Sequence, residues 1–195
     1  MSKLEPVLRD FPDSFETERL TIRCPLPGDG PELNAAVIES WDSLREWMPW
    51  AAQKQPTIEE SEANIRIAHT RFLAREDLRL SLFLKGTGIM VGGSGLHRMN
   101  WEVPSFEIGY WVRTRFAGQG YITEAVAGIT DFAIQELVAR RIEIRCDALN
   151  ERSAAIPRRL GYTLEATFRN HDRHHLTGQL RDTLIFAKIV EEMND

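Results

Sequence analysis

Cysteine is scarce in this sequence: only Cys24 and Cys146 occur among 195 residues, and no short spacing separates them. A metal knuckle needs closely spaced thiols, and a disulfide framework needs several cysteine pairs, so neither can be read from this pattern. Two isolated cysteines favour a reducing interior. We therefore expect a cytoplasmic protein without a metal site.

Long apolar runs and a strong positive charge are also missing. No stretch approaches the length of a membrane span, and residues 1–6 lack the apolar core of a signal peptide. The net charge of −5 argues against a protein that coats nucleic acid by bulk charge. We expect neither a membrane nor a nucleic acid as a partner.

The overall composition is that of an ordinary globular domain. About 43% of its residues are apolar, which rules out wholesale disorder, and 195 residues suit a single domain. No internal repeat, low-complexity tract or linker divides it. We predict a loosely held N-terminal arm over residues 1–14, one domain over residues 15–190 and a C-terminal tail over residues 191–195.

The spacing of apolar residues switches repeatedly between helical and strand periods. Strands are predicted over residues 17–23, 78–84, 89–96, 106–112, 141–146, 163–169 and 183–189. Helices are predicted over residues 31–39, 57–75, 123–137 and 153–160, the second beginning at a capping box of Thr57 and Glu60. Pro157 fits only the first turn of a regular helix, so a start before Ser153 requires a bent first turn. The order predicts an α/β fold with a mixed sheet, flanking helices and a central strand–loop–helix crossover.

A glycine motif, Arg115-x-x-Gly118-x-Gly120, stands at that crossover. A helix N-terminus offers unpaired N–H groups and the positive end of its dipole, so it attracts phosphate. Glycines let the backbone approach the anion closely, and Arg113 and Arg115 add charge. The alternative is an ordinary glycine turn. The third glycine of a dinucleotide motif and the Gly-Lys-Ser/Thr ending of a P-loop are both missing, so we interpret the motif as a pyrophosphate-binding loop.

A second motif, Asn150-Glu151-Arg152-Ser153, follows a predicted strand. Asn and Ser are good helix caps, and capping is the alternative to a role in a site.

The joint order of these features resembles the GNAT acetyltransferases. The similar stretches are Glu107–Val112, Arg115-Phe116-Ala117-Gly118-Gln119-Gly120-Tyr121-Ile122-Thr123-Glu124-Ala125, Arg141–Cys146, Asn150-x-x-Ser153 and Leu160-Gly161-Tyr162. Three more stretches look like the RimL/RimJ branch, which acetylates N-terminal amines of ribosomal proteins: Thr17-Glu18-Arg19-Leu20, Trp47-Met48-Pro49-Trp50 and Glu107-Ile108-Gly109-Tyr110-Trp111. The resemblance covers roughly residues 15–190 and implies a mostly antiparallel central sheet.

The resemblance also implies how acetyl-CoA is held as the cosubstrate. The backbone of Trp111 and Val112 would pair with the pantetheine arm like an added strand. Asn150 and Ser153 would line the far side of the thioester. The pyrophosphate would bind to the loop, whose implied residues are Arg113, Arg115, Phe116, Ala117, Gly118, Gln119, Gly120, Tyr121 and Thr123.

Acetyl transfer to an amine requires a neutral nucleophile, an oxyanion donor and an acid for the leaving thiolate. Many GNAT enzymes place a tyrosine four residues after the Ser153 position as that acid, but Pro157 stands there in this sequence. We therefore expect Ser153 to take that role. Glu107 and Asp172 are the candidate bases, and the alternatives are a surface strand residue and a solvated loop acid respectively.

Aromatic and histidine clusters supply further candidates. Trp41, Trp47, Trp50 and Trp101 are expected either to wall a substrate cleft or to serve as core. His171-Asp172-Arg173-His174-His175 contains metal-ligand types, but nothing else in the sequence completes a site, so a role as a substrate loop is the better hypothesis.

The sequence thus predicts an N-acetyltransferase that moves acetyl directly from acetyl-CoA to a primary amine, without an acyl-enzyme. The favoured acceptor is a protein N-terminal α-amine. A polyamine, an antibiotic amine, a non-catalytic CoA-binding sensor and a nucleotide-binding regulator remain as alternatives. A homodimer is a further possibility for which the sequence indicates no surface.

Overall fold

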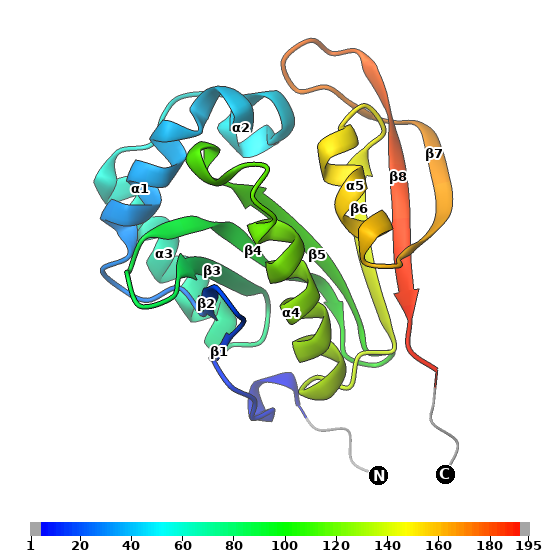
Figure 1. The fold of residues 1–195 in the computed structure, drawn as a ribbon, viewed down its shortest axis with the longest axis horizontal. Coiled ribbons are helices and arrows are strands. Elements are labelled where there is room, and N and C mark those ends of the chain that lie inside the picture. The colour runs from blue at the N-terminus through cyan, green and yellow to red at the C-terminus, as the bar shows by residue number, and fades with distance from the viewer. Residues whose placement is uncertain (1–4, 192–195) are drawn as a thin grey trace.

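A single eight-stranded sheet runs through the computed structural model, which describes residues 5–191 (Figure 1). Its order is β1-β2-β3-β4-β5-β6-β8-β7, and only β5 and β6 are parallel neighbours. The strands are β1 (Ser14–Glu16), β2 (Leu20–Arg23), β3 (Leu78–Leu84), β4 (Met90–Asn100), β5 (Ser105–Val112), β6 (Arg141–Asp147), β7 (Thr163–Arg173) and β8 (Leu180–Ile189). The predicted mixed, mostly antiparallel sheet is confirmed.

Five α-helices and three short 3₁₀ turns complete the described chain. The helices are α1 (Gly30–Glu39), α2 (Trp41–Trp47), α3 (Ile58–Leu73), α4 (Tyr121–Gln135) and α5 (Glu151–Arg159), and the 3₁₀ turns are Pro6–Leu8, Pro49–Ala51 and Thr114–Phe116. The capping box at the start of α3 is present, since Thr57 and Glu60 bond each other's backbone N–H groups. None of the helices in residues 5–191 is long and apolar enough to cross a bilayer.

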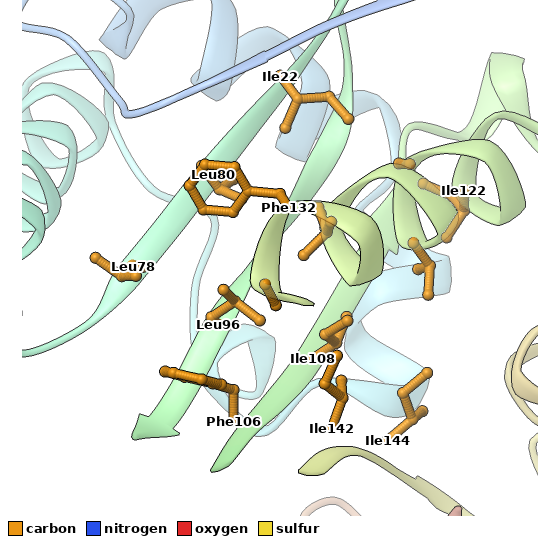
Figure 2. Close-up of a cluster of buried hydrophobic side chains, with 14 of the residues drawn as sticks. Ile22, Leu78, Leu80, Leu96, Phe106, Ile108, Ile122, Phe132, Ile142 and Ile144 are labelled. Carbon is orange, nitrogen blue, oxygen red and sulfur yellow. The ribbon is translucent and has the colours of Figure 1, made fainter. Parts of the chain in front are cut away.

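The two faces of the sheet carry different helices because side chains alternate along each strand. Leu78, Leu80 and Leu82 of β3 point to one face, where they form the main core with α4. Figure 2 labels Leu78 and Leu80 of this group. Phe83 points to the other face and packs in a second cluster with α1 and α3. The helix α4 therefore covers one side of the sheet, and α1 to α3 cover the other.

The parallel pair at the centre of the sheet comes apart along its length. Only Ser105 to Glu107 of β5 pair with Arg141 to Glu143 of β6. Beyond Glu107 the two strands diverge, while β5 stays paired to β4 as far as Val112. The divergence leaves one backbone edge of residues 108–112 without a strand neighbour.

Several predicted boundaries move, and two elements, β1 and the helix α2, were not predicted. The strand predicted over residues 17–23 begins only at Leu20, as β2, and residues 17–19 connect it to β1. The strand β7 continues to Arg173, so the first half of the histidine-rich segment is part of the sheet. The helix α5 begins at Glu151 rather than Ser153, with Pro157 inside it.

The predicted N-terminal arm makes specific contacts near its end. Phe11 packs edge-on against Phe72 and Phe132 and stacks on Trp101. Residues 1–4, and residues 192–195 of the predicted tail, lie outside the described part of the chain.

Candidate active site

The glycine motif lies where the sequence places it, between β5 and α4. Gly118 and Gly120 have φ values of +75° and +83°, a region that favours glycine. The amides of Phe116 and Ala117 bond carbonyls within the turn. In residues 5–191 no protein acceptor pairs with the amides of residues 118–123, which we call the α4 mouth. These donors, at the positive end of α4, form a ready anion site.

A partly buried network of hydrogen bonds connects the first turn of α4 to the residues before β2. The Glu124 carboxylate accepts hydrogen bonds from the Thr17 hydroxyl at 2.6 Å and from the Arg19 backbone N–H at 2.7 Å. It also pairs with the Arg19 side chain at 2.6 Å. Burial raises the Glu124 pKa, but the hydrogen bonds from Thr17 and Arg19 together lower it below its usual value. The Arg19 guanidinium lies over the Tyr121 ring and donates to the Gln119 carbonyl. The Thr17-Glu18-Arg19-Leu20 stretch, to which the sequence gave no role, therefore fastens β2 to the α4 mouth.

Arg113 and Arg115, which precede the α4 mouth, are both held in ion pairs with carboxylates of α1. The Arg113 side chain is 7% exposed and pairs with Glu32 and Glu39 of α1, each at 2.8 Å. Arg115 also pairs with Glu39, and hydrogen bonding from Arg115 and then Arg113 lowers the Glu39 pKa to about 2. This corrects the expectation that Arg113 adds charge for a phosphate: its guanidinium is buried and committed to carboxylates. The ion pairs tie the loop to α1.

Two hydroxyls meet across the space between the diverging strands. Tyr110 of β5 donates to the Ser153 carbonyl at 2.9 Å, and the Ser153 hydroxyl lies 3.2 Å from the Tyr110 oxygen. Pro157 explains why that carbonyl is available, because a proline has no N–H to donate to the residue four positions earlier. Burial raises the Tyr110 pKa, so its proton is retained. Tyr110 was missed as a site residue, although it stands in a stretch that carries the family resemblance.

Asn150 performs the capping role that the sequence left as an alternative. It is the N-cap of α5, and its side chain accepts the Ser153 backbone N–H at 3.0 Å. The cap holds Ser153 in the first turn of α5, facing Tyr110.

A cavity of about 580 Å³ opens on the face of the sheet that α1 to α3 cover. We call it the tryptophan cavity, and its lining includes Trp41, Trp50, Trp111, Tyr110 and His97. Glycines of β4 and β5 leave this face of the sheet without side chains at their positions, which makes room for the cavity and for Trp111. A Cβ on Gly93 would stand 2.5 Å from the Trp111 ring nitrogen. Trp41 and Trp50 thus both line one cavity.

The other two tryptophans lie elsewhere. Trp101 packs between Phe11 and Phe106, beside the main core, and it does not line the cavity. Trp47 lies under the Arg181 guanidinium, 5.4 Å from it. The substrate role expected of Trp101 is therefore corrected to one in packing.

Neither candidate base lines the cavity. The Glu107 carboxylate, 18% exposed, pairs with Arg145 of β6 at 3.0 Å and lies 3.6 Å from Arg98. Asp172 is exposed on β7 and accepts the Arg173 backbone N–H. Glu107 thus bridges β5 and β6 at the point where they begin to diverge.

The histidine-rich segment has a contact that the sequence did not indicate. Ring nitrogens of His174 and His175 lie 3.1 Å and 2.7 Å from the carbonyls of Glu46 and Arg45 at the end of α2. The β7–β8 hairpin thus reaches across to α2, as its position at the top of Figure 1 shows. We find no group of three metal-ligating side chains within residues 5–191.

Both cysteines are buried free thiols. Burial raises the pKa of Cys24 to about 12 and that of Cys146 to about 11. The fold does bring a histidine to Cys24, with His69 Nδ1 at 3.4 Å from the sulfur, but that nitrogen also lies 2.9 Å from the Pro25 carbonyl. Thiols with raised pKa values are poor nucleophiles at neutral pH.

Several known acetyltransferases are similar to this chain. The chain is 27% identical to the Bacillus subtilis protein named "Putative ribosomal N-acetyltransferase YdaF", over 90% of this chain and 93% of that one. Its fold matches the microcin C7 self-immunity acetyltransferase MccE, solved with acetyl-CoA and AMP, with a TM-score of 0.83, 23% identity and coverage of 92% and 98%. It also matches RimL, a ribosomal L7/L12 α-N-protein acetyltransferase solved with coenzyme A, with a TM-score of 0.81, 21% identity and coverage of 89% and 96%.

The family model described as "Acetyltransferase (GNAT) domain" matches residues 19–163, which include the diverging strands, the α4 mouth and the Ser153 turn. The chain therefore belongs to the GNAT acetyltransferase family, whose enzymes use acetyl-CoA.

Proposed function

We propose that this protein transfers an acetyl group from acetyl-CoA directly to the α-amine of a protein N-terminus. The observation that carries the proposal is the placement of three features around one gap: the free amides of the α4 mouth, the unpaired edge of β5 and the Tyr110–Ser153 hydroxyl pair. Acetyl-CoA has a pyrophosphate, an amide-bearing arm and a thioester, and each feature suits one of these groups.

The α4 mouth would hold the pyrophosphate. Six successive amides, from Gly118 to Thr123, need acceptors, and the positive φ of Gly118 and Gly120 lets the backbone curve around an anion. Arg19 adds positive charge at this loop in place of Arg113, because its guanidinium is partly exposed and would stand 3.5 Å from a Cβ on Gly120. Arg115 is 55% exposed and can also reach solvent-side phosphate oxygens.

The free edge of β5 would hold the pantetheine arm. The backbone groups of Trp111 and Val112 stand after the last β5–β6 pair, so an extended amide chain can add to them as a strand does. The same edge offers an N–H for the oxyanion.

The Tyr110–Ser153 pair would return the proton to the leaving thiolate. The buried Tyr110 hydroxyl keeps its proton at neutral pH, and the Ser153 hydroxyl contacts it. Direct transfer fits the raised pKa values of both buried cysteines, which make an acyl-enzyme on either one unfavourable.

Two observations support a protein N-terminus as the acceptor. The tryptophan cavity opens beside Tyr110 and is large enough for the first residues of a peptide. The named relatives are a ribosomal N-acetyltransferase and a ribosomal-protein α-N-acetyltransferase. A ribosomal-protein acceptor would place the enzyme in the cytoplasm.

The test compares matched acceptors by mass spectrometry. Peptides with a free α-amine should be acetylated, whereas the same peptides with a blocked N-terminus and an internal lysine should react far more slowly, because lysine titrates near ~10.4 and the α-amine near ~8. Faster turnover of a polyamine or an aminoglycoside would reject the N-terminal acceptor. Binding of CoA without any thiol release would favour the sensor alternative.

A further inference from the structure

We propose that His97, oriented by Asp77, is the general base that takes the proton from the acceptor amine. This inference rests on the proposed function and deepens it, because neither Glu107 nor Asp172 reaches the tryptophan cavity.

The first observation is a hydrogen-bonded pair. His97 Nδ1 lies 2.7 Å from the Asp77 carboxylate, and the two side chains are 31% and 32% exposed. A carboxylate accepts only from a protonated nitrogen, so the neutral imidazole carries its hydrogen on Nδ1. Its other nitrogen, Nε2, is then a free acceptor.

The second observation is where Nε2 lies. The His97 ring extends over two glycines, of which Gly109 lines the cavity: a Cβ on Gly109 would stand 3.6 Å from Nε2, and a Cβ on Gly95 of β4 would stand 2.9 Å from the ring carbon Cε1. Gly109 is two residues beyond the last β5–β6 pair, and the next residue is Tyr110. The basic nitrogen therefore faces the strand segment that would hold the thioester.

The third observation is a local distortion of β4. The pairing of β4 with β5 shifts register between His97 and Asn100, and Arg98 has φ of +46°. A non-glycine residue in that region is uncommon, and such strain concentrates at functional sites. The irregularity directly follows His97 along β4.

The charged groups around His97 come from three strands and one loop. Asp77 precedes β3 and Arg79 lies on β3. Glu107 of β5 is the register partner of His97, and it pairs with Arg98, the next residue of β4. Asp77 is the carboxylate in contact, and it stabilises the imidazolium that forms when Nε2 accepts a proton.

Acetyl transfer forms one bond, breaks one bond and moves one proton. The amine nitrogen forms a bond to the acetyl carbon, the carbon–sulfur bond breaks, and its electron pair leaves on sulfur. His97 Nε2 takes one proton from the nitrogen, and the Tyr110–Ser153 pair gives one proton to the sulfur. Exchange with solvent restores both groups, so the net change moves one proton from nitrogen to sulfur.

The experiment measures kcat and KM against pH for wild type and H97Q, with an N-terminal peptide as acceptor. We expect H97Q to lose roughly 100-fold in kcat near neutral pH, and to recover at high pH as the amine deprotonates by itself. Its affinity for CoA should not change. The matched control is H69Q, since His69 lies on α3 outside the tryptophan cavity and should leave kcat unchanged.

Two further variants keep the proposal testable if H97Q folds poorly. In H97A, added imidazole should restore part of the activity by binding over the glycines. In D77N the amide can donate to Nδ1, which places the hydrogen on Nε2, so kcat should fall by roughly 10-fold or more and the acidic limb of the pH profile should move. Unchanged kcat and pH profile in H97Q would overturn the proposal, whereas an inactive wild type would instead overturn the proposed function.

Discussion

At the α4 mouth the groups that face outward are backbone amides from six consecutive residues, 118–123. The tryptophan cavity, by contrast, is lined by side chains from α1, α2, α3, β3, β4 and β5. A backbone site can bind the invariant part of a cosubstrate, because phosphate oxygens need only N–H donors. A site of side chains can vary with the acceptor, and a few substitutions can change its chemistry. The difference explains why the sequence indicates the cosubstrate more sharply than the acceptor.

The largest effect is expected on stability, at Arg113, which joins the loop before the α4 mouth to a helix that lines the tryptophan cavity. Arg113→Ala removes the buried partner of Glu32 and Glu39, which tie α1 to the loop, and should lower the free energy of unfolding by about 3–5 kcal/mol. Arg115→Ala is the matched control: its side chain is 55% exposed, so its removal should cost only about 0–1 kcal/mol. Urea unfolding measures both. Equal effects would mean that the buried pair does not join the two regions.

The α4 mouth should respond next. Gly120→Val places a β-branched side chain at φ +83°, in the path proposed for the pyrophosphate, and we expect CoA to bind roughly 100-fold more weakly, or ~2.8 kcal/mol. Gly86→Val is the control, because Gly86 has φ +74° in a turn with open space around it. Isothermal titration with CoA measures the difference. A normal titration for Gly120→Val, in a folded protein, would remove the mouth from the cosubstrate site.

The hydroxyl pair in the gap should give the smallest change. Tyr110→Phe and Ser153→Ala should each lower kcat by roughly 10-fold with little rise in KM, since the proton is needed when the thiolate leaves. The double variant should lose less than the product of the two, because the hydroxyls act as one unit. Steady-state kinetics with a thiol reagent provide the test. If Ser153→Ala retains its full turnover number, Ser153 has no part in the mechanism.

Several features could be predicted because near neighbours determine them. The capping box of Thr57 and Glu60 spans three residues, and both its hydrogen bonds form. Gly118 and Gly120 need positive φ for the turn into α4, so the glycine spacing alone located the mouth. The strand period of β6, and that of the first half of β5, followed from the alternation of buried residues, because one face of each strand packs in the main core.

Other features depend on contacts between distant residues, which only the packed chain determines. Tyr110 reaches Ser153 because β5 and β6 diverge and because Pro157 frees a carbonyl, and no local pattern carries that combination. His97 meets Asp77 through the register of β3 with β4.

The sequence by itself determined most of the elements, though not β1 or α2, together with the glycine turn and the family, since these follow from spacing along the chain. Tertiary structure alone decided that Arg113 is buried, that Trp101 packs beside the core and that His97 lies in the cavity. The physical reason is that a side chain's role depends on which strands and helices are its neighbours, and sheet register and the α4 crossover fix those neighbours across gaps of 20 to more than 70 residues.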